Sequence, residues 1–79
     1  MPFILKEENM ARISNVTTVP GTVDGRGNRK VTYTLIKDDG KRTVLTLDVS
    51  GNQQRVRQLL AAHHSIPEDN ITFDPRYGD

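Results

Sequence analysis

The sequence predicts a small α+β domain, in which an antiparallel β-sheet with the element order β-ββ-α-β has one amphipathic helix packed on one face. Three observations lead to this prediction. Two alternating apolar runs flank a tight-turn signal, an apolar stripe with helical spacing follows them directly, and a short alternating segment comes last. We expect a single domain over residues 11–75, a flexible N-terminal segment at residues 1–10 and a tail at residues 76–79.

The two central runs, residues 30–37 and 42–49, place apolar or β-branched side chains at every second position, as half-buried strands do. Asp38, Asp39 and Gly40 lie between the runs and predict a three-residue hairpin loop with Gly40 in the left-handed conformation. This loop sets the large apolar residues of both strands on one face, whereas a two-residue turn would divide them between two faces. The predicted cross-strand pairs are Val31 with Leu47, Tyr33 with Leu45 and Leu35 with Thr43.

A helix should follow the hairpin, because Ser50 and Gln53 have the spacing of a capping box and place the helix start near Gly51. Its apolar stripe would cover the apolar face of the hairpin and consists of Val56, Leu59, Leu60 and His63. The side chains expected to face solvent are Gln54, Arg55, Arg57 and Gln58. Pro67 ends the helical pattern. The two remaining strands are predicted at residues 11–19 and, on a sheet edge, at residues 71–73.

The charge balance and the absence of cysteine narrow the classes of function. Eleven Lys and Arg against ten Asp and Glu give a formal net charge of +1, so the chain lacks the strongly basic field of a typical nucleic-acid binder. Without cysteine, disulfides, thiolate metal sites and thiol nucleophiles are excluded, and such a composition suits a reducing compartment. The sequence contains neither a signal-peptide core nor an apolar run of membrane-spanning length. We therefore expect a cytoplasmic protein.

Five cations are candidate partner-binding residues. Arg26, Arg29 and Lys30 lie with two glycines just before the hairpin, where a mobile loop would let them contact phosphates. The alternative is a solvated loop whose charges keep the chain soluble. Arg55 and Arg57 on the exposed helix face are candidate anchors for a protein partner, although solubility alone would select the same residue types.

Residues with catalytic or metal-binding chemistry do not gather at one place in the sequence. His63 and His64 are adjacent, so on a helix their imidazoles point about 100° apart and do not share one metal ion. His63 extends the apolar stripe as a partly buried residue, and His64 favours the helix C-terminus through the helix dipole. The carboxylates lie in turns and tails, where turn formation explains them. We expect no catalytic residue, no metal site and no cofactor.

These observations leave three hypotheses for function. The first is a non-enzymatic binding module, an adaptor or inhibitor of a larger cytosolic protein, of the phage or mobile-element accessory type. Its binding surface would be the helix or an open sheet edge, which also allows a homodimer. The second is a nucleic-acid-binding protein that uses the loops around Arg26 to Lys30 and around Lys41 and Arg42. An enzyme completed by dimerisation through His63 or His64 ranks last.

Overall fold

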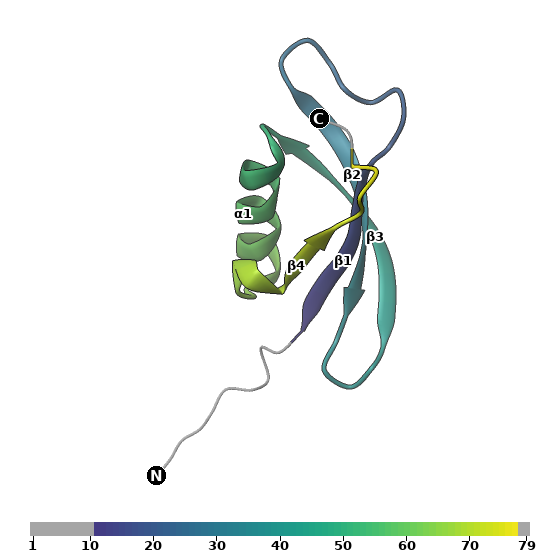
Figure 1. The fold of residues 1–79 in the computed structure, drawn as a ribbon, viewed down its shortest axis with the longest axis vertical. Helices are drawn as coiled ribbons and strands as arrows, with labels where there is room; N and C mark the ends of the chain where they lie inside the picture. The colour runs from purple at the N-terminus through teal and green to yellow at the C-terminus, as the bar shows by residue number, and fades with distance from the viewer. Residues whose placement is uncertain (1–10, 78–79) are drawn as a thin grey trace.

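The computed structural model describes residues 11–77, and within them the predicted α+β fold class is confirmed. The strands form one four-stranded sheet, which is curved and has the long helix on one side (Figure 1). The predicted segment 1–10 and the last two residues of the predicted tail lie outside the described residues. The elements in chain order are β1 (Arg12–Thr18), β2 (Asn28–Ile36), β3 (Arg42–Ser50), α1 (Gln53–His64), the 3-10 helix η2 (Glu68–Asn70) and β4 (Ile71–Phe73).

The strands are arranged in the order β3-β2-β1-β4, so β3 and β4 form the two edges of the sheet. The pairs β1–β2 and β2–β3 are antiparallel, but β4 runs parallel to β1. The prediction of an edge position for the last strand is confirmed, and the prediction of a purely antiparallel sheet is wrong. The reason is the helix between β3 and β4, because a strand reached through a crossover helix runs parallel to the strand before that helix.

The register of the β2–β3 hairpin is the one predicted from the three-residue loop. The Lys37 N–H donates to the Lys41 carbonyl at 2.9 Å, and Gly40 has φ 89°. The left-handed conformation of Gly40 is what a turn with a bulge requires. The observed pairs include Val31 with Leu47, Tyr33 with Leu45 and Leu35 with Thr43.

A bulge in β1 explains why its apolar residues are three positions apart. The register with β2 shifts between Ser14 and Thr17, and Asn15 has φ 58°. Asparagine is one of the few residues that tolerate this left-handed conformation. The extra residue places Ile13 and Val16 on the same face of the sheet, and both are fully buried there.

The core lies between α1 and the face of the sheet that the helix covers, which we call the inner face; the opposite face is the outer face (Figure 1). Tyr33 is buried in this core as predicted. The prediction that the helix covers the whole apolar face of the hairpin is too broad, because three leucines of that face are only partly buried. These are Leu35, Leu45 and Leu47. The buried core residues are Ile13, Val16, Val31, Tyr33, Val49, Val56, Leu60, Ala61, Ile66 and Ile71.

The start of α1 differs from the predicted capping box. Ser50 is the last residue of β3, and Asn52 is the N-cap, with its side-chain oxygen accepting the Arg55 N–H at 3.0 Å. Gly51 makes this arrangement possible, because it turns the chain from strand to helix with φ 96°. A Cβ at Gly51 would also lie 2.6 Å from Cγ of Arg55. The helix therefore begins at Gln53 rather than near Gly51.

The buried face of α1 is rotated relative to the predicted stripe. Val56 and Leu60 are buried as expected, but His63 is exposed and His64 is half-buried. Positions 56, 60 and 64 follow one another at intervals of four residues, which keeps them on one side of a helix. The prediction that His63 is partly buried is therefore wrong, and His64 is the histidine on the buried side of the helix. No helix within residues 11–77 is long and apolar enough to cross a membrane.

The helix cap gives a direct test of this local structure. Replacing Asn52 by alanine removes the acceptor for the Arg55 N–H, so N52A should lower the free energy of unfolding by about 1 kcal/mol. The matched control S50A, which removes the hydroxyl of the predicted capping box, should change it by less than about 0.5 kcal/mol. Urea unfolding followed by circular dichroism measures both. A larger effect of S50A than of N52A would contradict the observed cap.

Candidate functional site

The five predicted cations do not form one basic surface. Arg29, expected in an exposed loop, is instead part of β2 and only 6% exposed, so its predicted loop position is wrong. Its Nη1 donates to the Tyr77 hydroxyl at 3.3 Å, and its Cζ lies 5.7 Å from the centroid of the Tyr77 ring. This geometry is that of a cation–π contact. Arg29 thus holds Tyr77, which the sequence analysis assigns to a tail, against the core.

Arg57 packs on the aromatic ring of Phe73, as Arg29 packs on the ring of Tyr77. Its Nη2 donates to the Ile71 carbonyl at 3.4 Å, and its Cζ lies 5.1 Å from the centroid of the Phe73 ring. The rings of Phe73 and Tyr77 are in edge contact, with centroids 4.8 Å apart. The prediction that Arg57 faces solvent is therefore wrong, because its guanidinium covers the C-terminal strand and is half-buried.

The remaining three cations are exposed and lie on three different segments: the turn before β2, β2 itself and α1. Arg26 lies in a turn whose conformation Asp24 fixes by accepting the N–H groups of Arg26 and Asn28 at 2.8 and 2.9 Å. These backbone hydrogen bonds hold the pKa of Asp24 below its usual value. Lys30 lies on the outer face, where its Nζ is 3.0 Å from Asp48 Oδ1. Arg55 lies in the first turns of α1, over Gly51.

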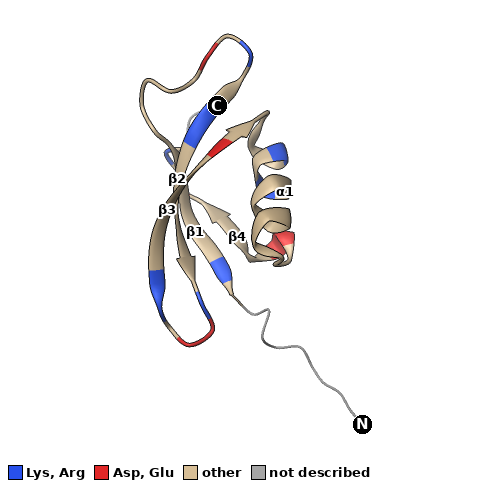
Figure 2. Cartoon of the chain, turned by 180° about the vertical axis from the view of Figure 1, so that it is seen from behind, with Lys and Arg blue, Asp and Glu red and all other residues tan. Residues whose placement is uncertain are grey.

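The two loops proposed to contact nucleic acid lie at opposite ends of the hairpin. Residues 26–30 lead into the start of β2, whereas Lys41 and Arg42 lie at the start of β3, beyond the end of β2. Lys30 lies opposite Asp48, six residues along β3 from Arg42, which corresponds to a separation of roughly 20 Å. Figure 2 shows blue and red segments together at both ends of the sheet. The structure therefore brings together neither a single basic patch nor the groups of one phosphate site.

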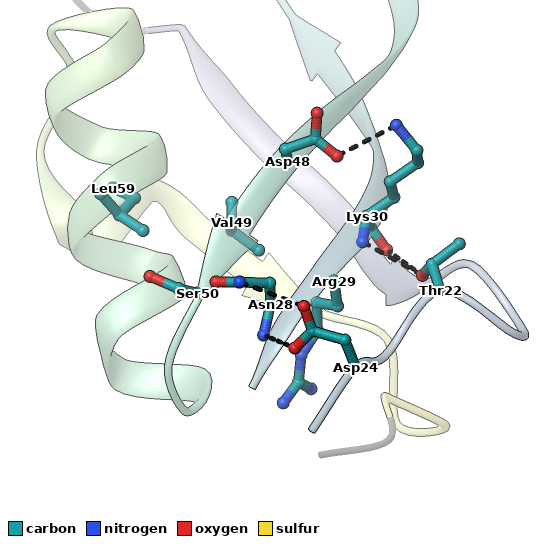
Figure 3. Close-up of a pocket in the computed structure, with 9 residues that line it drawn as sticks. All are labelled: Thr22, Asp24, Asn28, Arg29, Lys30, Asp48, Val49, Ser50 and Leu59. Atoms are coloured by element: carbon teal, nitrogen blue, oxygen red, sulfur yellow. Dashed lines mark hydrogen bonds and ion pairs between the residues drawn. The ribbon is translucent and has the colours of Figure 1, made fainter. Parts of the chain in front are cut away.

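An open hollow of about 630 Å³ lies where β2 begins, β3 ends and α1 passes over them (Figure 3). Its lining combines two acidic and two basic side chains with the apolar Val49 and Leu59. Asp24 and Asn28 are hydrogen-bonded to each other, and Lys30 is paired with Asp48, as the dashed lines in the figure show. Because the charges balance, this hollow does not select a ligand of one sign.

His64 forms a hydrogen bond with a core residue, Tyr33. His64 Nε2 lies 2.8 Å from the Tyr33 hydroxyl, which donates to it when the ring carries its own proton on Nδ1. Burial lowers the pKa of His64, and the neighbouring His63 acts in the same direction. Burial also raises the pKa of Tyr33, so this hydroxyl keeps its proton. Among residues 11–77 there is no cluster of three or more side chains suited to hold a metal ion.

The surface with the clearest capacity for binding is the outer edge of β3. The bond between Lys37 and Lys41 fixes which residues of the hairpin are hydrogen-bonded pairs. Such pairs alternate along an antiparallel ladder, so the odd-numbered residues of β3 bond β2, and the even-numbered residues direct their N–H and C=O groups away from the sheet. The bond from the Val19 N–H to the Lys30 carbonyl agrees, because it shows the even-numbered residues of β2 facing β1.

This edge is long and accessible. β3 has nine residues, and within the described part of the chain no strand and no further backbone hydrogen bond occupies its outer side. The other edge strand, β4, has only three residues, and a short edge gives little template for pairing. Five residues of β3 direct their backbone N–H and C=O groups away from β2, and all five are exposed. They are Arg42, Val44, Thr46, Asp48 and Ser50.

The side chains along β3 suit strand pairing. Residues 43–47 contain no charge, glycine or proline and are β-branched or apolar throughout. Val44 is 67% exposed on the outer face, and Leu45 and Leu47 are partly buried on the inner face. A sheet edge was one of two binding surfaces expected from the sequence. The sequence alone does not reveal that β3 is the open edge, because β1 could have paired on either side of the hairpin.

Comparison of the chain with models of protein families, with curated proteins and with solved structures gives no significant match. The function is therefore argued from the geometry of the molecule alone.

The pairing of Tyr33 with His64 predicts a pH-dependent stability. Because the pKa of His64 is lower in the folded chain than its ordinary value of 6.5, the unfolded chain binds more protons below that pH. The free energy of unfolding should therefore be largest above pH 6.5 and decrease as the pH falls below it. Urea unfolding between pH 7.5 and pH 5.5 measures this.

Two variants identify the group responsible. In H64Q most of the decrease should disappear, whereas H63Q should retain most of it, because His63 is exposed. The acidic residues with lowered pKa values, Asp24 and Asp74, act at lower pH, since their ordinary value is 3.8. An unfolding free energy that stays constant or rises on acidification would show that His64 is not held neutral by the fold.

Proposed function

We propose that the chain is a non-enzymatic binding module that recognises another polypeptide by accepting an extended segment of it on the outer edge of β3. The observation that carries the proposal is the nine-residue edge strand, with five outward-facing and exposed positions. Backbone N–H and C=O groups at such an edge pair readily with an added strand. The biological role we propose is that of a cytoplasmic adaptor or inhibitor.

Strand addition would use both the backbone and the side chains of β3. Main-chain hydrogen bonds supply affinity that does not depend on the partner's sequence, and alternate side chains supply specificity. On the outer face the partner strand would meet Val44 and Thr46, and on the inner face it would extend the apolar surface of Leu45 and Leu47. The polar ends of the edge, at Arg42 and Asp48, would limit how the added strand is aligned.

The titratable side chains with shifted pKa values support a binding role, because each has a local structural partner. Asp24 organises the turn before β2, and Asp74 accepts the Arg76 N–H at 2.7 Å and pairs with the same guanidinium. His64 bonds Tyr33 in the core. These groups stabilise the fold, and catalytic groups would instead converge on a shared substrate position.

A pair of variants at one position tests the proposal. T46P removes an N–H that faces away from the sheet, so the β2–β3 ladder keeps its bonds and an edge position tolerates the proline. T46V keeps that N–H and serves as the matched control. The bait is a tagged chain in a nuclease-treated cell lysate supplemented with untagged chain, and the retained polypeptides are identified by mass spectrometry.

The wild type and T46V should retain the same polypeptide, and T46P should retain at least about tenfold less of it, because one or more main-chain bonds and the close strand approach are lost. Circular dichroism establishes that all three proteins are folded. Retention that T46P leaves unchanged, or that is seen only in a parallel lysate without nuclease, would overturn the proposal.

A further inference from the structure

We infer that the polypeptide on the β3 edge is the β3 strand of a second copy of the chain, aligned antiparallel with Leu45 at the centre of the pair. This inference rests on the proposed function, because it uses the same open edge. It specifies the occupant and its alignment, and it places contacts with any larger partner protein on the surface of the dimer rather than on this edge. Two copies joined in this way would form one continuous eight-stranded sheet, since each copy contributes a four-stranded sheet.

The alternation of backbone groups restricts the alignment. Only the even-numbered residues of β3 direct their backbone N–H and C=O groups toward the free edge. They must therefore form hydrogen-bonded pairs with even-numbered residues of the second copy. With Leu45 at the centre, Arg42 lies opposite Asp48 of the second copy, and the two-fold symmetry repeats this pair. Val44 then lies opposite Thr46 of the second copy. The two β-branched pairs occupy the centre, and the two ion pairs close the ends.

Neighbouring alignments do not match the charges. With Thr46 at the centre, Arg42 would lie opposite Ser50, and Asp48 would lie opposite the exposed Val44. With Val44 at the centre, Asp48 would lie opposite Gly40, in the turn. The alignment centred on Leu45 is therefore the one that pairs both charged residues with opposite charge. Opposite charges facing each other across strands stabilise the pair, and like charges destabilise it.

Asp48 can make this contact without losing its existing partner. Its side chain is 79% exposed, and it accepts from Lys30 through Oδ1. The second carboxylate oxygen is thus available to a guanidinium arriving from the adjacent strand. Lys30 and Arg42 of the second copy would then lie on either side of the same carboxylate.

The inner face gives an independent argument. The two-fold axis of an antiparallel strand pair is perpendicular to the sheet, so both copies of α1 lie on the same side of the joined sheet. Each helix follows the C-terminal end of its own β3, and the centre of the pair lies nearer the hairpin end. Leu45 of both copies would meet between the two helices, with Leu47 beside Thr43 of the second copy. The partly buried leucines would thereby be covered.

In the same alignment, the acidic residues of each hairpin turn lie near the positive N-terminal end of the second copy's α1. Gly40 lies opposite Ser50 of the second copy, so the acidic turn at Asp38 and Asp39 comes close to the start of the second copy's α1. The first turn of α1 has no acidic residue, and Arg55 lies within it. The positive end of the helix dipole there favours neighbouring carboxylates.

Charge reversal tests the inference and its alignment together. R42D and D48R each place like charges opposite one another in both end pairs, so each should weaken the dimer roughly 30-fold. An equimolar mixture of R42D with D48R restores both opposite-charge pairs and should form a mixed dimer, and the double variant R42D/D48R should dimerise with itself. The matched control D69R changes the charge by the same amount as D48R at an exposed site beside the other edge, and it should dimerise like the wild type.

The measurement is sedimentation equilibrium over a concentration series at low salt, with native mass spectrometry of the mixture. A wild type that stays monomeric at all concentrations would overturn the inference; if T46P still abolished retention of a different protein, the proposed function would stand.

A dimer that R42D and D48R leave unchanged, or a mixture without mixed dimers, would overturn the alignment centred on Leu45. Circular dichroism of each variant separates loss of pairing from loss of folding.

Discussion

The length of α1 limits how much of the sheet the chain can cover. With 12 residues the helix spans roughly 18 Å, whereas the nine-residue strands β2 and β3 each span roughly 27 Å. The helix also has to lead from β3 on one edge to β4 on the other. It therefore buries Val31 and Tyr33 on the central strand β2, and it leaves Leu35 near the hairpin end and Leu45 and Leu47 on the edge strand β3 only partly covered. The partly buried leucines follow from this constraint, and two of them lie on β3, which the strand order leaves as the long open edge.

The other side of the sheet is closed by two arginines that the sequence predicts as exposed cations. Arg57 covers Phe73, Arg29 covers Tyr77, and the two rings touch. These contacts fasten the short strand β4 and the residues after it, which have few backbone bonds of their own. Within residues 11–77, these two arginines are therefore not available to form a basic face. The open β3 edge is then the more distinctive feature of the surface.

The parts of the structure that were predictable from the sequence are those set by short-range periodicity. The hairpin register followed from the alternation of apolar residues and from Gly40, and the edge position of β4 followed from its short length. The bulge at Asn15 was not predictable, because one residue in a left-handed conformation changes which side chains share a face without changing the composition. The N-cap was misassigned because Ser50 and Asn52 both have capping side chains, and the strand extends one residue further than its apolar pattern.

The candidate site was less predictable than the fold, for a physical reason. The roles of Arg29 and Arg57 depend on aromatic residues 48 and 16 positions away in the sequence, so no local pattern shows that Arg29 is buried and Arg57 half-buried. The open edge depends likewise on which strand lies beside which, and that order is set by the crossover helix. Sequence patterns define strands, but they do not define which strand lacks a neighbour.

Amide hydrogen exchange along β3, measured by NMR at low and at high protein concentration, tests most directly whether this edge is open in one chain and closed by another. The amides of Leu45 and Leu47 bond β2 and should be protected at both concentrations, whereas those of Val44, Thr46 and Asp48 should exchange rapidly in dilute solution and become protected in concentrated solution. If the outward-facing amides are protected in a dilute sample that sedimentation shows to be monomeric, the edge is already covered within one chain; if they exchange rapidly at both concentrations, no second copy pairs with it. Either result would contradict the account.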